Sequence, residues 1–165
     1  MKKIIALLLL SLMSLSLPSY SDGLSCKRTS EKEIQELFTR WNDSLLAGDY
    51  HKVVSENYAL DSILLPTVSS VPRVSVASKE DYFHHFLESE PSGKITFSHI
   101  QIGCNSAIDS GLYTFTFAKP RDGSPSTVHA RYTYTYIWTG KKWLISSHHS
   151  SVNPTEIEAQ IYKSL

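Results

Sequence analysis

The second half of the chain alternates aromatic and polar residues, and this pattern constrains the fold more than any other. The stretches GLYTFTFAK (residues 111–119), VHARYTYTYIW (128–138) and WLISSHHSS (143–151) follow one another with short glycine-containing turns between them. A period of two places successive side chains on opposite faces of a β-strand. Three such strands with short connections predict an antiparallel meander.

The first half of the chain has helical periodicity instead. Behind the capping sequence Ser30–Glu33, apolar residues recur at helical spacing until Gly48, namely Ile34, Leu37, Phe38, Trp41 and Leu45. Asp49 is expected to cap a second helix, SILLP (62–66) is expected to form a short buried strand, and Ser78 is expected to start a third helix that the turn PSG (91–93) ends. Helices followed by a sheet predict an α+β fold, a cone-shaped curled antiparallel sheet wrapped round the N-terminal helix.

The N-terminus has the layout of a secretory signal peptide. Lys2 and Lys3 precede an apolar run that ends near Leu17, and the small-x-small triplet Ser19-Tyr20-Ser21 follows. The run is too short for a membrane-spanning helix. We therefore expect residues 1–21 to be removed and residues 22–165 to form one exported domain, periplasmic or secreted, with its core at about 31–154.

The composition of the expected mature chain excludes one class of partner. Removing Lys2 and Lys3 from the 16 basic residues leaves 14 against 16 acidic ones. Neither the net charge nor a basic stripe indicates nucleic-acid binding, and no membrane partner is expected after cleavage.

Cys26 and Cys104 are the only cysteines. An oxidising compartment would favour their pairing, and closing so long a loop would stabilise the fold by roughly 4 kcal/mol. Two free thiols are the alternative.

The doublet His148-His149 invites a metal or catalytic interpretation, but a regular strand points adjacent side chains to opposite faces, so the two cannot share one metal ion. The HExxH and Cys-His spacings of zinc sites and the G-x-S-x-G elbow of serine hydrolases are absent from the sequence. We therefore expect no metal, no cofactor and no serine triad.

The order of these elements resembles the nuclear transport factor 2-like (SnoaL-like) cone that ketosteroid isomerase, scytalone dehydratase and polyketide cyclases share. The strings WNDSLLAGDY, SILLPT, IGCNSAIDSGLYTFTF, ARYTYTYIW and WLISSHHSS are similar to the association (hub) domain of calcium/calmodulin-dependent protein kinase II and its stand-alone bacterial relatives. This resemblance implies a conical pocket between the sheet and the first helix, and self-assembly into dimers or larger rings through the outer sheet face. It does not imply kinase activity, because the chain has no Gly-rich loop, HRD or DFG motif.

The expected pocket residues follow from the faces of the strands and from the resemblance. If Tyr132, Tyr134 and Tyr136 make the oligomer contact, Arg131 points into the cone, where its guanidinium could hold a carboxylate. His149 matches a histidine of the hub motif and is the candidate for a pocket or catalytic role. Further residues are expected at the pocket walls or at its mouth: Trp41, Tyr82, Phe86 and Arg73.

These residues favour binding of a small organic, anionic molecule by a homo-oligomer. One alternative is an isomerase, dehydratase or cyclase that uses His149 or a tyrosine as acid or base. A second is a structural hub with a vestigial pocket. The carboxylate base of a ketosteroid isomerase has no evident counterpart, because Asp61 stands at the start of its strand and Asp109 is expected in a turn.

Overall fold

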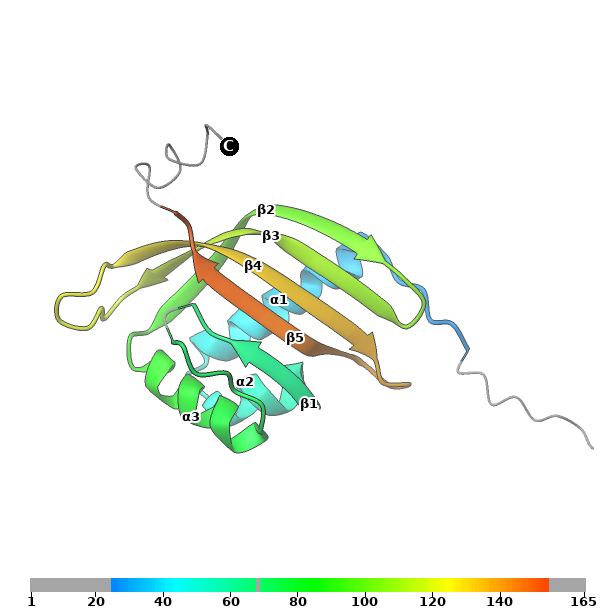
Figure 1. Ribbon diagram of the computed structural model, residues 1–165, viewed down its shortest axis with the longest axis horizontal. Coiled ribbons are helices and arrows are strands. Elements are labelled where there is room, and N and C mark those ends of the chain that lie inside the picture. Colours follow the sequence, from blue (N-terminus) through cyan, green and yellow to red (C-terminus); the bar gives the residue numbers. More distant parts are fainter. Residues whose placement is uncertain (1–24, 68, 155–165) are drawn as a thin grey trace, which may run out of the picture.

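The computed structural model describes residues 25–67 and 69–154, which form three helices and a five-stranded sheet (Figure 1). In chain order the elements are α1 (Glu31–Leu46), α2 (Tyr50–Asn57), β1 (Tyr58–Leu65), α3 (Val76–Leu87), β2 (Pro91–Ile102), β3 (Ser106–Phe117), β4 (Thr127–Trp138) and β5 (Trp143–Val152). The predicted signal peptide lies outside the described residues. Of the helices described, none has the length and apolarity needed to cross a membrane.

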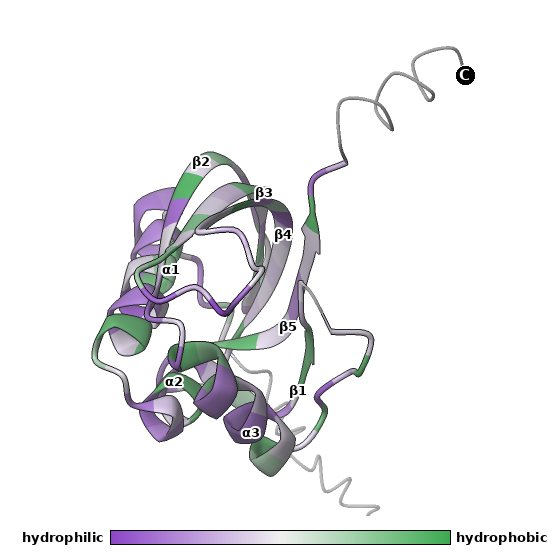
Figure 2. Cartoon of the chain, turned by 90° about the vertical axis from the view of Figure 1, so that its left-hand side faces the viewer, coloured by the Kyte–Doolittle hydropathy of each residue, from purple (hydrophilic) through white to green (hydrophobic). Residues whose placement is uncertain are grey.

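The strands are ordered β1-β5-β4-β3-β2, and the sheet curls round α1 while α2 and α3 lie to one side (Figure 2). Strands β2 to β5 form the predicted antiparallel meander. β1 pairs parallel to β5, so the sheet is mixed rather than wholly antiparallel. No hairpin constrains the direction of β1, because α2 precedes it and α3 follows it. The predicted α+β class is confirmed.

The apolar stripe of α1 forms the centre of the core. Its predicted residues are all buried against the inner face of the sheet: Ile34, Leu37, Phe38, Trp41 and Leu45. Trp41 meets the rings of Phe115 and Tyr134 edge-on at 6.1 and 6.0 Å between centroids. Ser30 caps the helix by accepting a hydrogen bond from the Glu33 amide at 3.2 Å, as the sequence predicts.

Three boundaries differ from the sequence-based expectation, and the first is that β1 begins at Tyr58 and not at Ser62. α3 begins at Val76 with Ser75 as its N-cap, and Ser75 and Ser78 bond each other's backbone amides at 3.0 Å, so Ser78 lies inside the first turn. PSG is the start of β2 and not a turn. The chain reverses just before it, where Glu90 adopts a positive φ of 49°.

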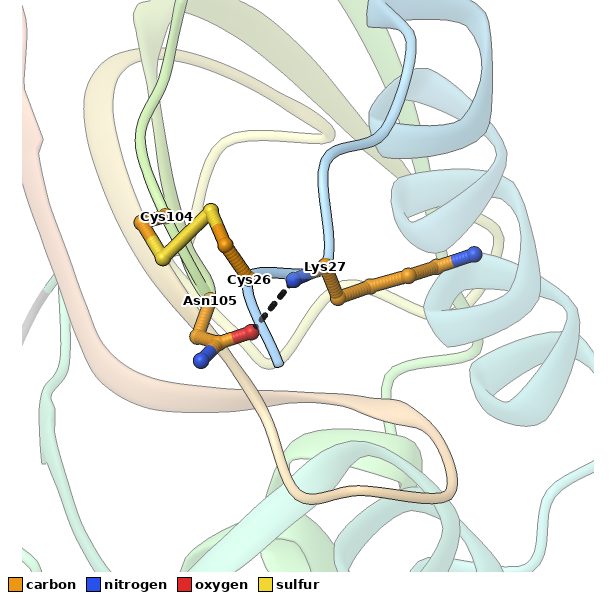
Figure 3. Close-up of a disulfide and its surroundings, with 4 residues drawn as sticks. All are labelled: Cys26, Lys27, Cys104 and Asn105. Atoms are coloured by element: carbon orange, nitrogen blue, oxygen red, sulfur yellow. Dashed lines mark hydrogen bonds between the residues drawn. A yellow bond between two sulfur atoms is a disulfide. The ribbon is translucent and has the colours of Figure 1, made fainter. Parts of the chain in front are cut away.

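A disulfide joins Cys26 to Cys104 and ties the N-terminal segment to the turn between β2 and β3 (Figure 3). Their Cα atoms lie 5.1 Å apart, and the Lys27 amide donates a hydrogen bond of 2.8 Å to Asn105 Oδ1. The Trp138 amide donates to the Asn105 carbonyl at 2.9 Å, which fixes the same turn to the end of β4. The predicted pairing is present in this structure.

Candidate functional site

A β-bulge in β5 decides which histidine of the doublet faces inward. Thr135 pairs with Ser147 and Tyr136 with Ile145, so Ser146 has no partner of its own in the ladder. The extra residue inverts the alternation of faces. Ile145 is inward before the bulge and His148 after it, whereas an unbroken alternation would have brought His149 inward.

The predicted orientations of Arg131 and His149 are therefore wrong. Both side chains are exposed on the outer face of the sheet. Tyr132, Tyr134 and Tyr136 are buried on the inner face instead, because the sheet covers α1 with its large aromatic side chains. The expectation that only one histidine of the doublet faces the cone is confirmed, but that histidine is His148.

His148 lies in a polar cluster at the bottom of the cone. The Tyr58 hydroxyl hydrogen-bonds His148 Nδ1 at 2.7 Å, and Trp41 meets the imidazole edge-on at 5.6 Å between centroids. Beside them, the Tyr113 hydroxyl donates to Ser150 Oγ, which also shares a hydrogen bond with the Thr67 hydroxyl. His148 Nε2 and Trp41 Nε1 are buried and have no hydrogen-bond partner among the described residues.

Apart from Tyr58, the residues of this cluster line an inner cavity of about 20 Å³, which has room for about one water molecule. Trp41, Tyr82 and Phe86 all line it, so the structure brings these three sequence-predicted wall residues together.

Burial moves the pKa values of this cluster away from neutral pH, so its groups do not readily exchange protons there. It lowers the pKa of His148 to about 3, with the neighbouring His149 charge as a further cause. Burial also raises the pKa of Tyr113 to about 12 and holds the pKa values of Tyr58 and Tyr134 well above their ordinary value. Efficient general acid–base catalysis uses groups whose pKa lies near the working pH, so the cluster is better suited to neutral hydrogen bonding.

A second, larger cavity of about 840 Å³ opens beyond Tyr82 and Phe86, which also line it. Its other walls come from the loop between β3 and β4 and from the end of β5, so it lies at the end of β3 opposite the disulfide. Apolar side chains, including Phe117, Val128 and Val152, cover much of the lining.

Arg73 is the less exposed of the two arginines that line this outer cavity. Its backbone makes two hydrogen bonds to Leu64, of 2.9 and 3.0 Å, and so fixes the loop that precedes α3. Its guanidinium lies over the Tyr82 ring at 5.9 Å and donates to Asp81 at 2.9 Å, while Nε has no hydrogen-bond partner among the described residues. The guanidinium is therefore held at the cavity by the Tyr82 ring and the Asp81 carboxylate.

The other charged groups on the lining are also basic. Arg121 from the β3–β4 loop lines the cavity and donates to the Glu88 carboxylate at 3.1 Å, and His85 and His129 contribute imidazoles. Among the described residues that line the cavity, none is acidic. The sequence pointed to Arg73 as a residue of the mouth but gave no sign of Arg121, which lies in a turn-rich loop far along the chain.

Asp109 is a buried carboxylate that the turn-like string Asp109-Ser110-Gly111 does not reveal. It lies in β3, fully buried, where the Ser98 and Tyr132 hydroxyls donate to its Oδ1 at 2.6 and 3.1 Å. Burial raises the pKa of its carboxyl group. Gly111 serves close packing and not a turn, since a Cβ there would lie 2.0 Å from the Phe97 carbonyl oxygen.

Comparison with known families gives one match over most of the chain. The family described as "Calcium/calmodulin dependent protein kinase II association domain" matches residues 30–154. No match is found among curated proteins.

Solved structures agree with this match. A protein from Xanthomonas campestris, described as a candidate calcium/calmodulin dependent protein kinase II association domain, is 42% identical, with a TM-score of 0.71 over 76% of this chain and 89% of its own. An NTF2-like protein with a cystatin-like fold from Novosphingobium aromaticivorans is 13% identical (TM-score 0.62; 79% of this chain, 87% of that one). A nuclear transport factor 2-like protein from Salmonella enterica is 16% identical (TM-score 0.64; 76% and 92%). At such identities the last two show a common fold alone.

Proposed function

The chain belongs to the calcium/calmodulin-dependent protein kinase II association domain family, and we propose that it is an exported, self-associating member that binds a small organic anion in its outer cavity. Export is proposed from the layout of residues 1–21, and a disulfide suits an oxidising compartment.

The charge of the cavity lining carries the binding proposal. Two arginines and two histidines line the outer cavity without an acidic residue among its described lining. A planar guanidinium binds a carboxylate through two parallel N–H···O bonds, and Arg73 is already held in place by Leu64 and Tyr82. An anion is therefore the ligand charge that this cavity favours.

The aromatic residues of the lining favour an anion that also carries an apolar organic group. The aromatic walls Tyr82, Phe86 and Phe117 would cover an apolar group, and about 840 Å³ is within the range of small-molecule sites. The low pKa of His148 and the high pKa values of the tyrosines support binding over acid–base turnover.

Phenylacetate is a suitable probe, because it combines a carboxylate with an aromatic ring. We expect calorimetry to detect its binding and the uncharged phenylacetamide to bind at least about tenfold more weakly, as the loss of a charged hydrogen bond predicts. Arg73→Gln should weaken phenylacetate binding by a similar factor, and Arg121→Ala by less because that side chain is more exposed.

Arg131→Ala tests the residue that the sequence favours. Since Arg131 lies on the outer face, its loss should leave phenylacetate binding unchanged. Binding that survives Arg73→Gln but is lost in Arg131→Ala would contradict the proposed site. An absence of binding across a panel of small carboxylates would contradict the proposed function.

We place the self-association contact on the outer face of the sheet. Phe97 and Leu112 are cross-strand partners there, with 58% and 38% of their surfaces exposed, and Leu112 also pairs with Arg131. Membership of an association-domain family supports the proposal.

A charge placed in this contact should break it. We expect light scattering to report an oligomer for the native protein and a monomer for Leu112→Glu, because an unpaired charge in an apolar interface is costly. Leu60→Glu is the matched control, since Leu60 is 83% exposed in β1 and away from Phe97 and Leu112. A native monomer at micromolar concentration would rule out self-association.

A further inference from the structure

We propose that the end of α3 binds a divalent transition-metal ion of the zinc class through His84, His85 and Glu88. One ligand atom from each of the three residues lies within 4.8 Å of the other two. His85 Nδ1 and Glu88 Oε1 are only 3.2 Å apart, a separation that lets both atoms coordinate one zinc ion at about 2.1 Å. All three side chains are exposed, so an ion reaches them without any change in the fold.

The helix explains why these three groups meet. Glu88 follows His84 by four residues and His85 by three, and residues at both spacings are neighbours on a helix surface. The C-terminal end of a helix also favours a positive charge. The expectation of no metal site rests on the absence of the HExxH and Cys-His spacings and does not take into account the spacing of His84 and Glu88.

Neighbouring side chains lie close to the proposed ligands. Asp81 Oδ1 lies 3.9 Å from His85 Nε2, the ring nitrogen opposite the proposed ligand atom. Arg121 donates to Glu88 Oε2 and leaves Oε1 for the metal, and the Tyr50 ring meets His84 edge-on at 5.1 Å between centroids. A carboxylate on the far nitrogen of a ligating imidazole is the usual way in which proteins orient such a ligand.

The chemistry of the donors selects the ion. Two imidazoles and one carboxylate suit zinc and its neighbours, whereas calcium and magnesium need more oxygen ligands than this site offers. Three protein ligands leave a coordination position open, and His85 also lines the outer cavity. The inference does not rest on the proposed anion binding, because the donor set alone defines it.

Titration of Zn²⁺ into the purified protein, without a histidine tag, tests the proposal by calorimetry. We expect one Zn²⁺ per chain and no binding of Mg²⁺ at the same concentration. His85→Ala and Glu88→Gln should each weaken Zn²⁺ binding at least about tenfold, and Asp81→Asn about tenfold, as the loss of an orienting partner predicts. His99→Ala is the matched control, since His99 is an exposed histidine on β2, and it should bind Zn²⁺ as the native protein does.

Nuclear magnetic resonance gives a readout that a purely structural role would not change. Zn²⁺ should shift the imidazole resonances of His84 and His85 and leave those of His99 and His129 unchanged. The proposal is wrong if His84→Ala and His85→Ala bind Zn²⁺ as tightly as the native protein, or if Zn²⁺ produces no heat and no shift at these two histidines.

Discussion

Loss of the Cys26–Cys104 disulfide is expected to lower the free energy of unfolding by about 4 kcal/mol. The bond closes a loop with a sequence separation of 78 residues, and the gain from closing a loop grows with its length because the unfolded chain loses more freedom. In a protein of this size, a loss of about 4 kcal/mol corresponds to a fall of roughly 8–16 °C in melting temperature. Urea denaturation of the native protein and of Cys104→Ser measures the difference.

Matched variants separate the effect of losing the disulfide on stability from the effect of changing each cysteine side chain. Cys26→Ser, Cys104→Ser and the double variant should all be destabilised equally, because the second substitution removes nothing further once the bond is lost. Reducing agent should lower the stability of the native protein to that of the variants and should not affect Cys104→Ser. Additive losses in the double variant, or a native protein indifferent to reduction, would contradict this account.

The disulfide also acts on a region that other contacts hold in place. Lys27 bonds Asn105, and its ammonium lies 5.3 Å from the Trp138 ring centroid. These contacts belong to the end of the sheet farthest from the outer cavity. Reduction should therefore destabilise the fold while phenylacetate binding survives at temperatures where the reduced protein remains folded.

Elements defined by periodicity and by local caps could be predicted from the sequence. The stripe of α1, the Asp49 cap of α2 and the long strands β4 and β5 each follow from residues close together in the chain. Because these features lie in residues close together in the chain, they predict the elements without knowledge of the tertiary contacts.

The inward face of a strand could not be predicted in the same way. The alternation from Tyr132 to Trp138 defines two faces but does not say which of them covers α1. In β5 the bulge at Ser146 also exchanges the inner and outer faces for the residues that follow it. Nothing in the sequence SSHHSS distinguishes the bulged serine from its neighbours. The sequence therefore predicts Arg131 and His149 on the inner face, whereas the structure has both on the outer face.

Residues gathered from distant loops were the hardest to foresee. Arg73 and Arg121 reach the outer cavity from segments that lack strong periodicity, and Asp109 looked like part of a turn because Gly111 follows it. In each case the deciding contact is made by a residue of another element, namely Leu64 in β1, Glu88 at the end of α3 or Phe97 in β2.

The histidine doublet provides a test of the corrected faces, because the buried His148 should make the protein sensitive to acid. The pKa of His148 falls to about 3 in the folded protein from its ordinary value of 6.5, so the unfolded chain binds the proton first. The stabilisation from the neutral buried imidazole is therefore complete above about pH 6.5. It is lost as the pH falls, by about 1.4 kcal/mol for each pH unit, until the folded protein also takes up a proton near pH 3.

The size of this effect follows from where the imidazole lies. His148 is enclosed by Tyr58, Trp41 and Tyr134, and the cationic form would have no carboxylate in contact with it among the described residues. The neighbouring His149 charge also opposes a positive charge on His148. Between pH 7.5 and pH 4.5 the loss should reach about 3 kcal/mol.

Urea denaturation from pH 7.5 to 4.5 measures this loss in the native protein, His148→Gln and His149→Gln. The glutamine at 148 cannot take up a proton, so its stability should fall less steeply by about 1.4 kcal/mol per pH unit below pH 6, whereas His149→Gln should follow the native slope. Asp109, whose raised pKa acts in the opposite direction, is common to all three proteins and cancels in the comparison.

If His148→Gln does not fold, the imidazole resonances of the native protein decide the matter, since His148 should remain neutral at pH 4.5. Equal slopes in all three proteins, or a flatter slope in His149→Gln alone, would show that the inward histidine has been misidentified.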